Sequence, residues 1–224
     1  MKNSATGVGE LPVPDRLLLA CGVLGALLNV IVMIVLGEMR PGYYALQMPD
    51  SLLELGEGGW MQIANYLGTG ALMVGFAIGL RRVLHNGRGF FWVPALLGLY
   101  GLTFIGIGIF VTDPQFGFPP GASAELTVHG LIHNLLGQTQ FISLTAACFV
   151  LSQRDAADPS RRGWTRYSLI TGLLLAVSDV VFVFTFKMGG PAGLVERTGI
   201  VVGSLWIALL AIRLLTKKIS GESI

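Results

Sequence analysis

The sequence predicts an all-α integral membrane protein in which six transmembrane helices form one bundle. The chain is 53% hydrophobic and only 12% charged, and its apolar residues fall into six long stretches separated by short polar gaps. A soluble domain carries about 25% charged residues, and a helix needs roughly 20 apolar residues to span the hydrocarbon layer. Six such helices use most of the 224 residues, so we expect no separate soluble domain.

The six stretches give the expected helices in order. They cover residues 16–36, 60–80, 90–111, 127–151, 166–186 and 198–215. The first exceeds the length of a signal-peptide core and no small-residue cleavage site follows it, so we expect an uncleaved helix. The transmembrane domain is therefore expected over 16–216, between a flexible cytoplasmic tail at 1–15 and a second cytoplasmic tail at 217–224.

The basic residues predict the orientation of this bundle. Twelve Lys and Arg lie at the two ends of the chain or in the second and fourth gaps, and three (Arg40, Lys187 and Arg197) lie in the other gaps. Short cytoplasmic loops are enriched in Lys and Arg. We therefore expect a multi-pass protein of the cell (inner) membrane with both termini in the cytoplasm and membrane lipids around it. Because no basic face is interleaved with aromatic residues, no nucleic-acid partner is expected.

Small residues line one face of several helices. The second helix carries the clearest series, which is Ala64, Gly68, Ala71, Gly75 and Gly79. Small faces let helix backbones approach closely in lipid, which favours tight packing within the bundle. The alternative is that such Gly-rich faces, including Gly199 and Gly203, bind a membrane-protein partner or a second copy of the chain.

The gap after the first helix contains a short helix signal. Ser51 and Glu54 have the spacing of a capping box, and Gly56 would end the turn. We expect a short helix on the outer membrane surface, with capping as the favoured role of Glu54 and participation in a pocket as the alternative.

Polar residues gather where the third helix ends and the fourth begins. His129 and His133 are four residues apart and share a helical face, Gln140 continues that face, and Asp113 should lie close by. Asp179 lies within the fifth helix, where an ionisable side chain costs at least roughly 2.5–3.5 kcal/mol and indicates function by default. With Glu54 these residues are the candidate ligand-binding pocket, and hydrogen bonding between helices is the structural alternative.

Two histidines at this spacing can share a metal ion. Zinc is the candidate cofactor, with His129, His133 and Asp113 as candidate ligands, Asp179 as the alternative to Asp113, and a water in the open position. No Glu lies between the histidines as an HExxH base would require.

Four blocks of the chain carry a resemblance to a known family. SLLELGEGGWMQIANYLGTG, GIFVTDP, LTVHGLIHN and GLVERTGIVVGSLWIALLAIRLL resemble the prokaryotic six-helix membrane proteins catalogued as domain of unknown function 998. The resemblance implies that Glu54, Asp113, His129, His133 and the pair Glu196-Arg197 are positions to watch. The family often has Ser where this chain has Leu53, so a role for that serine does not carry over. The HxxxH pair also resembles, more weakly, the pair found in alkaline ceramidases and adiponectin receptors. This chain lacks their third zinc-binding histidine and their seventh helix.

These patterns favour one functional hypothesis over three others. The favoured one is an outward-facing polar pocket that binds a lipid head group or another small ligand, with no claim of turnover. The alternatives are a zinc-dependent hydrolase of lipid amides or esters, a proton-coupled transporter that uses Asp179 and the histidines, and a structural subunit of a membrane complex. The sequence names no catalytic residue.

Overall fold

The structure, a computed structural model, describes residues 11–84, 89–155 and 159–216. Its helices in chain order are α1 (Val13–Met39), η1 (Asp50–Glu54), α2 (Trp60–Val83), α3 (Trp92–Ile109), α4 (Val128–Asp155), η2 (Pro159–Arg161), α5 (Arg162–Met188) and α6 (Ala192–Thr216). The six α-helices are long and apolar enough to cross a membrane. The predicted all-α, six-span fold class is therefore confirmed. The expected tails fall largely on 1–10 and 217–224, which lie outside the described residues.

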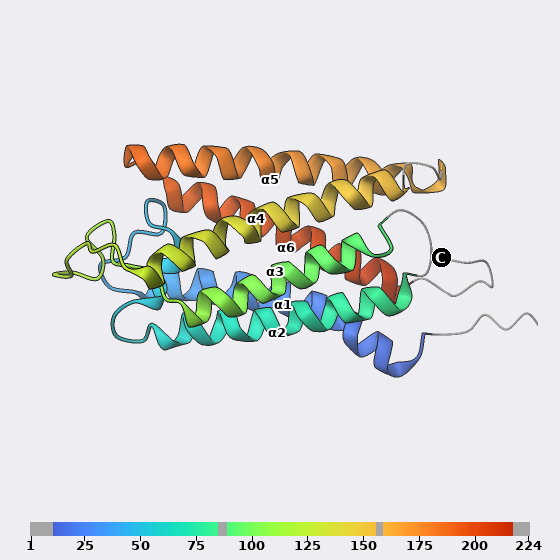
Figure 1. Cartoon of the computed structure of the whole chain (residues 1–224), viewed down its shortest axis with the longest axis horizontal. Coiled ribbons are helices and arrows are strands. Elements are labelled where there is room, and N and C mark those ends of the chain that lie inside the picture. The colour runs from blue at the N-terminus through green and yellow to red at the C-terminus, as the bar shows by residue number, and fades with distance from the viewer. Residues whose placement is uncertain (1–10, 85–88, 156–158, 217–224) are drawn as a thin grey trace, which may run out of the picture.

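The six helices form a closed ring that follows the order of the chain. Each α-helix packs against its neighbours in sequence, and α6 packs against α1, so the helices run side by side along the long axis (Figure 1). α5 lies at the edge of the bundle: only 17% of its most apolar window is buried, against 50% in α2, α3 and α6. A helix with so little buried surface is solvated mainly by lipid.

Two helix boundaries differ from their predicted positions for a local reason. Pro12 caps α1 and a proline stands in its first turn, where the missing N–H costs nothing, so the helix begins at Val13 rather than at Arg16. α5 ends in the left-handed Gly189, and α6 begins directly after Pro191. The predicted start of α6 at residue 198 is therefore wrong, and Glu196 and Arg197 belong to the helix rather than to a loop.

The small residues of α2 serve packing within the chain. A side chain at Gly79 would meet Leu18, and one at Gly75 would meet Cys21, both on α1. On another side of α2, Gly70 packs against Gly101 of α3. A Cβ added at either glycine would contact the backbone oxygen of the other. Backbones that approach this closely leave no room for a Cβ.

The GxxxG step of α6 is also covered by the chain itself. Gly199 faces Ser178 of α5 and Phe141 of α4, and Gly203 faces Leu144 and Leu175. An oligomer through the Gly-rich faces of α2 and α6 stays a prediction, because these glycines already contact helices of the same chain.

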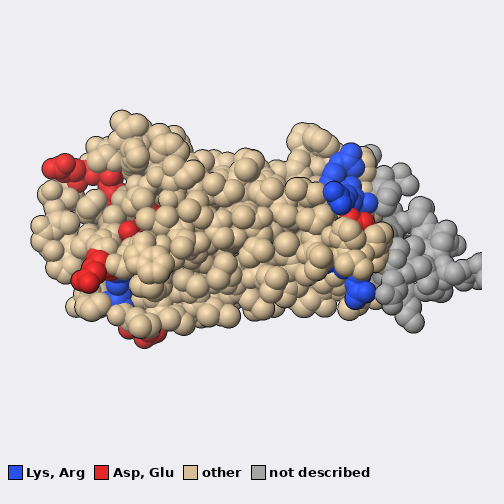
Figure 2. All heavy atoms as spheres, turned by 90° about the horizontal axis from the view of Figure 1, so that it is seen from below, with Lys and Arg blue, Asp and Glu red and all other residues tan. Residues whose placement is uncertain are grey.

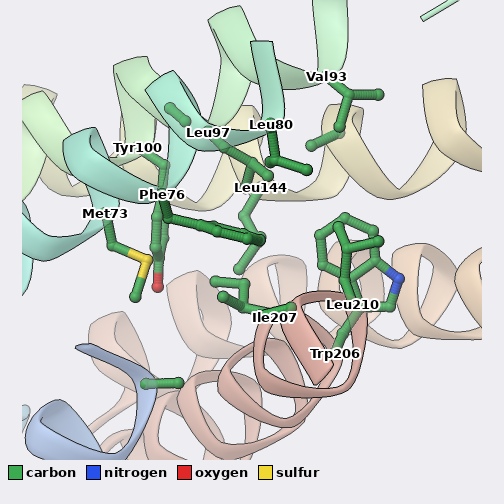
Figure 3. Close-up of a cluster of buried hydrophobic side chains, with 14 of the residues drawn as sticks. Met73, Phe76, Leu80, Val93, Leu97, Tyr100, Leu144, Trp206, Ile207 and Leu210 are labelled. Atoms are coloured by element: carbon green, nitrogen blue, oxygen red, sulfur yellow. The ribbon is translucent and has the colours of Figure 1, made fainter. Parts of the chain in front are cut away.

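A hydrophobic core fills the centre of the ring. Phe76, Leu97, Leu144, Trp206 and Leu210 are among its buried side chains, and they come together from α2, α3, α4 and α6 (Figure 3). The indole nitrogen of Trp206 donates to the hydroxyl oxygen of Ser168 over 3.0 Å, which satisfies a polar group that would otherwise be costly to bury.

The bundle has two chemically different ends. We call the end that carries η1 and the α3–α4 and α5–α6 connections the acidic end, and the end that carries the α2–α3 and α4–α5 connections the basic end. Asp and Glu gather at the first, and most of the described Lys and Arg gather at the second (Figure 2). This separation of charge is the arrangement that the sequence predicted, whereas which end faces the cytoplasm stays a prediction.

Candidate functional site

A cavity of about 260 Å³ lies within the half of the bundle nearer the acidic end. All six α-helices and η1 contribute side chains to its wall. The volume is just below the roughly 300 Å³ at which small-molecule pockets usually begin. The cavity therefore has room for a small molecule or for the head group of a larger one.

The wall of the cavity has an apolar part and a polar part. The apolar part is mainly aromatic and contains Tyr66, Phe104, Phe141, Phe182 and Phe186. The polar part contains the buried side chains Asn29, Asp50, His133, Gln140 and Glu196. A wall of this kind suits an amphiphilic ligand, because each part of the ligand meets a surface of its own polarity.

The polar stripe predicted on α4 reaches the cavity. His133, Gly137 and Gln140 are spaced by four and three residues, so they lie on one face of the helix, and all three line the wall. A Cβ added at Gly137 would meet no atom within 4 Å. The missing side chain of Gly137 thus adds to the open space.

Two carboxyl groups meet at the polar part of the wall. The backbone N–H of Asp50 donates to Oε2 of Glu196 over 2.7 Å, and the side-chain amide of Gln62 donates to Oδ2 of Asp50 over 3.3 Å. Asp50 is 4% exposed and Glu196 is 8% exposed. These contacts join η1, α2 and α6, and they place two acidic side chains against one cavity.

A series of amides extends from this pair into the bundle. Asn65 donates to Asn29 and to Gln62, and Thr69 donates to Asn65, each over 3.3 Å. All four side chains are buried. Because buried polar groups are costly without partners, this network holds α1 and α2 in one register next to the cavity.

Glu54 lies in a second buried cluster, beside the cavity wall. Its Oε2 accepts the backbone N–H of Thr112 over 3.0 Å and lies 3.6 Å from Nδ1 of His133. Burial raises the pKa of the Glu54 carboxyl to about 9, so the group is neutral at pH 7 and its contact with His133 is not an ion pair. Nδ1 of His133 is bound instead to the carbonyl oxygen of Phe110 at 2.8 Å.

The capping role predicted for Glu54 is wrong. η1 is a five-residue 3-10 helix whose N-terminus has no side-chain cap, and the Glu54 carboxyl reaches the α3–α4 connection. The Glu54 carboxyl satisfies the backbone N–H of Thr112, which would otherwise be a buried donor without a partner.

Asp113 and His129 lie apart from the cavity wall. Both oxygens of Asp113 accept hydrogen bonds from Thr127, at 2.8 Å from its N–H and 2.6 Å from its hydroxyl, which fixes the chain at the start of α4. Gly130 packs so closely against this carboxylate that a Cβ there would overlap it. His129 is exposed, and its ring packs edge-on against Phe110.

The proposed metal ligands are therefore not assembled. Within the described ranges, no three His, Cys, Asp or Glu side chains lie together in a way that could hold a metal ion. Each member of the candidate zinc set has another role: Asp113 binds Thr127, His133 binds Phe110, and His129 packs on an aromatic ring.

Asp179 is half-buried on α5 and does not line the cavity. Its neighbour across the helix interface is Gln138 of α4, which does line it. Oδ1 of Asp179 is buried and has no hydrogen-bond partner within the described chain. Of the predicted pocket residues, His133 and Gln140 line the cavity, and Glu54, Asp113, His129 and Asp179 surround it or lie beyond it.

Arg197 fastens the α1–α2 connection to α6. Its Nη1 donates to the carbonyl oxygens of Ala45 and Met48 over 2.7 and 3.0 Å, and its Nη2 donates to the hydroxyl of Tyr43. The N–H of Leu194 adds a bond to the carbonyl of Leu46 over 2.9 Å. Burial raises the pKa of Tyr43, so this phenol stays neutral beside the guanidinium.

The local sequence pattern does not place Asp50, Asn29 or Glu196 in a pocket, although the family resemblance marks Glu196 as a position to watch. Asp50 lies 146 residues from Glu196, and nothing in the local pattern links them. A signal for Glu196 was nevertheless present, because Gly189, Gly190 and Pro191 end one helix and open the next. A helix that begins after Pro191 contains Glu196. Glu196 is then an acidic residue inside a transmembrane helix, and such a residue is a functional candidate for the same reason as Asp179.

A family comparison identifies the chain. The model described as "Protein of unknown function (DUF998)" matches residues 23–213. The chain belongs to this family. The match runs from α1 to α6, so the predicted resemblance is confirmed, and the chain is a multi-pass membrane protein in contact with lipid. No curated protein and no solved structure matched it.

Proposed function

We propose that this member of the DUF998 family binds the head group of a lipid, or another small amphiphile, in the cavity near the acidic end. The observation that carries the proposal is the cavity itself, a space of about 260 Å³ bounded by aromatic side chains and by buried polar groups. The cavity is open to the surface of the bundle on one side, where the exposed Lys187 contributes to its wall. An open space bounded by aromatic rings and a few buried polar groups is typical of a small-molecule site.

We further propose that the acidic end faces outward, in the cell membrane, with both termini in the cytoplasm. The support is the excess of Lys and Arg at the basic end. Labelling of a single cysteine placed at the N-terminus by an impermeant reagent from outside intact cells would contradict this orientation.

The alternatives receive less support from the contacts. Hydrolysis with zinc needs a ligand set, and the described residues contain no group of three ligands. For proton transport the histidines and Asp179 would have to form a relay, but His129 packs on Phe110 and Asp179 lies next to Gln138. A structural role in a complex predicts nothing about the cavity.

Filling the cavity tests the proposal without altering a hydrogen bond. Gly137→Leu places a side chain into open space in the wall, so the fold should persist while the ligand is excluded. The matched control is Gly163→Leu, because Gly163 is exposed at the start of α5 and a Cβ there also meets nothing within 4 Å.

The measurement is the lipid that remains bound after purification in a neutral detergent, counted per chain by native mass spectrometry. We expect a species bound to the wild type and to Gly163→Leu that Gly137→Leu has lost. Equal retained lipid in all three proteins would overturn the proposal, because annular lipid does not depend on the cavity.

A further inference from the structure

The polar part of the cavity wall carries an excess of acidic groups. Asp50 and Glu196 both line it, both are more than nine-tenths buried, and the backbone N–H of Asp50 donates to the Glu196 carboxyl. Two carboxylates this close in a medium of low polarity repel each other unless a proton or a cation lies between them. Such a pair holds a proton in the empty protein, and the charged group of a cationic ligand can take the place of that proton.

The cations of the protein lie outside the buried part of the wall. Arg197 attracts both Asp50 and Glu196, but its donors are engaged by Ala45, Met48 and Tyr43 on the side of the loop, and it does not line the cavity. Lys187 lines the cavity from α5, but it is exposed. The buried end of the wall consequently stays acidic.

A second observation at the same wall indicates a missing partner. Asn29 is 2% exposed and lines the cavity. Its side-chain oxygen accepts the bond from Asn65, whereas within the described residues its amide nitrogen donates to no protein group. Because Asn29 lines the cavity, its amide nitrogen can donate a hydrogen bond to an acceptor on a ligand that enters there.

The aromatic part of the wall suits a cation as well. Tyr66, Phe104, Phe141 and Phe182 line the same space. The face of an aromatic ring attracts an ammonium or quaternary ammonium group, and the attraction grows when water is excluded. Carboxyl groups and aromatic rings around one space are a combination that recognises such a group.

We propose that the ligand of this cavity is a cationic amphiphile, whose amine or quaternary ammonium group lies between Asp50, Glu196 and the aromatic wall and whose apolar part lies toward α5. This inference rests on the proposed function and adds the chemical class of the ligand. The polar neighbours of the ammonium are the carboxyl oxygens, and the amide of Asn29 is placed to bind an oxygen of the same ligand.

The test uses three probes with one chain length and different charge. n-Octyltrimethylammonium, n-octanol and n-octyl phosphate are titrated into the full-length protein in a neutral detergent, and affinity is measured from the concentration dependence of its thermal stabilisation. The variants are Glu196→Gln, which keeps an oxygen to accept the Asp50 N–H, and Asp50→Asn, which keeps that N–H. Gly137→Leu and its control Gly163→Leu are measured in parallel.

We expect the ammonium probe to bind the wild type about tenfold more tightly than the alcohol, because a desolvated charge gains from both the carboxyls and the rings. Each charge-removing variant should abolish this preference and leave the binding of the alcohol unchanged. The phosphate probe should bind more weakly than either.

Two other outcomes separate the inference from the proposed function. Equal binding of the ammonium and the alcohol, both weakened by Gly137→Leu, would overturn the cationic ligand and leave an amphiphile site. Binding of every probe unaffected by Gly137→Leu would overturn both. If one charge variant does not fold, the other decides the preference, because each removes one of the two carboxyls.

Discussion

The acidic and basic ends of the bundle differ in how deeply their charged side chains are buried. At the acidic end Asp50, Glu54 and Glu196 are buried and accept backbone or amide hydrogen bonds. At the basic end Arg82 and Arg166 are exposed. The pocket there measures about 30 Å³, against about 260 Å³ at the acidic end.

The difference follows from the chemistry of the two kinds of group. A carboxyl can take up a proton and become neutral, and its oxygens can satisfy N–H groups that would otherwise lack a partner. A guanidinium cannot lose its charge, so it stays hydrated, as at Arg82 and Arg166, unless carbonyl and hydroxyl oxygens surround it, as at Arg197. The acidic end can therefore enclose a polar cavity, whereas the basic end anchors the helices at the membrane surface.

The largest expected effect concerns the buried carboxyl of Glu54. Its pKa is about 9 in the folded protein, against a reference value of 4.5, so the folded state binds the proton more tightly than the unfolded chain. This contribution to stability is fully present below about pH 4.5 and is lost as the pH rises toward about 9, with a slope of at most about 1.4 kcal/mol per pH unit. Glu54→Gln should flatten the decline.

Thermal unfolding in detergent at pH 5, 7 and 9 measures this effect. The matched control is Asp15→Asn at the basic end, which should keep the pH dependence of the wild type. If Glu54→Gln unfolds with the same pH dependence as the wild type, the buried carboxyl does not hold its proton in the manner described.

An intermediate effect should separate two glycines of α4. Gly130→Ala forces a methyl group into the Asp113 carboxylate that fixes the start of α4, and overpacking of this kind costs about 1–3 kcal/mol. Gly137→Ala adds a methyl group to open space and should be neutral or stabilising by up to about 1 kcal/mol, since alanine is the better helix former. Chemical denaturation of the two variants in the same detergent provides the measurement.

The order of the two glycine variants is the informative result. A Gly137→Ala protein that is less stable than Gly130→Ala would contradict the prediction. It would show that the cavity has no room for a methyl group at residue 137 and that the Asp113 carboxylate can move away from residue 130.

The smallest effect is expected at the basic end. Arg82 donates to Asp15 over 3.4 Å, and the arginine side chain is 54% exposed. An exposed ion pair contributes less than about 1 kcal/mol and is screened by salt. Asp15→Asn should therefore shift the melting temperature little at low salt and not at all at high salt. A shift as large as that of Gly130→Ala would remove the contrast between the two ends.

The sequence by itself determined the fold class, the number of helices and the separation of charge between the two ends. These properties depend on local quantities, namely the length of each apolar stretch and the residues in each gap, and neither needs knowledge of distant contacts. The polar face of α4 could also be read locally, because His133, Gly137 and Gln140 follow the helical repeat.

Only the tertiary structure decided which polar residues share one space. Glu54 had the spacing of a local cap but turned to Thr112, 58 residues away, and Asp50 met Glu196 across 146 residues. Asp113 and His129 were expected beside His133, yet Asp113 is bound to Thr127 at the start of α4, and His129 is exposed. The physical reason is that a buried carboxyl is satisfied by whichever donor the packed helices bring within reach, and that donor belongs to another part of the chain.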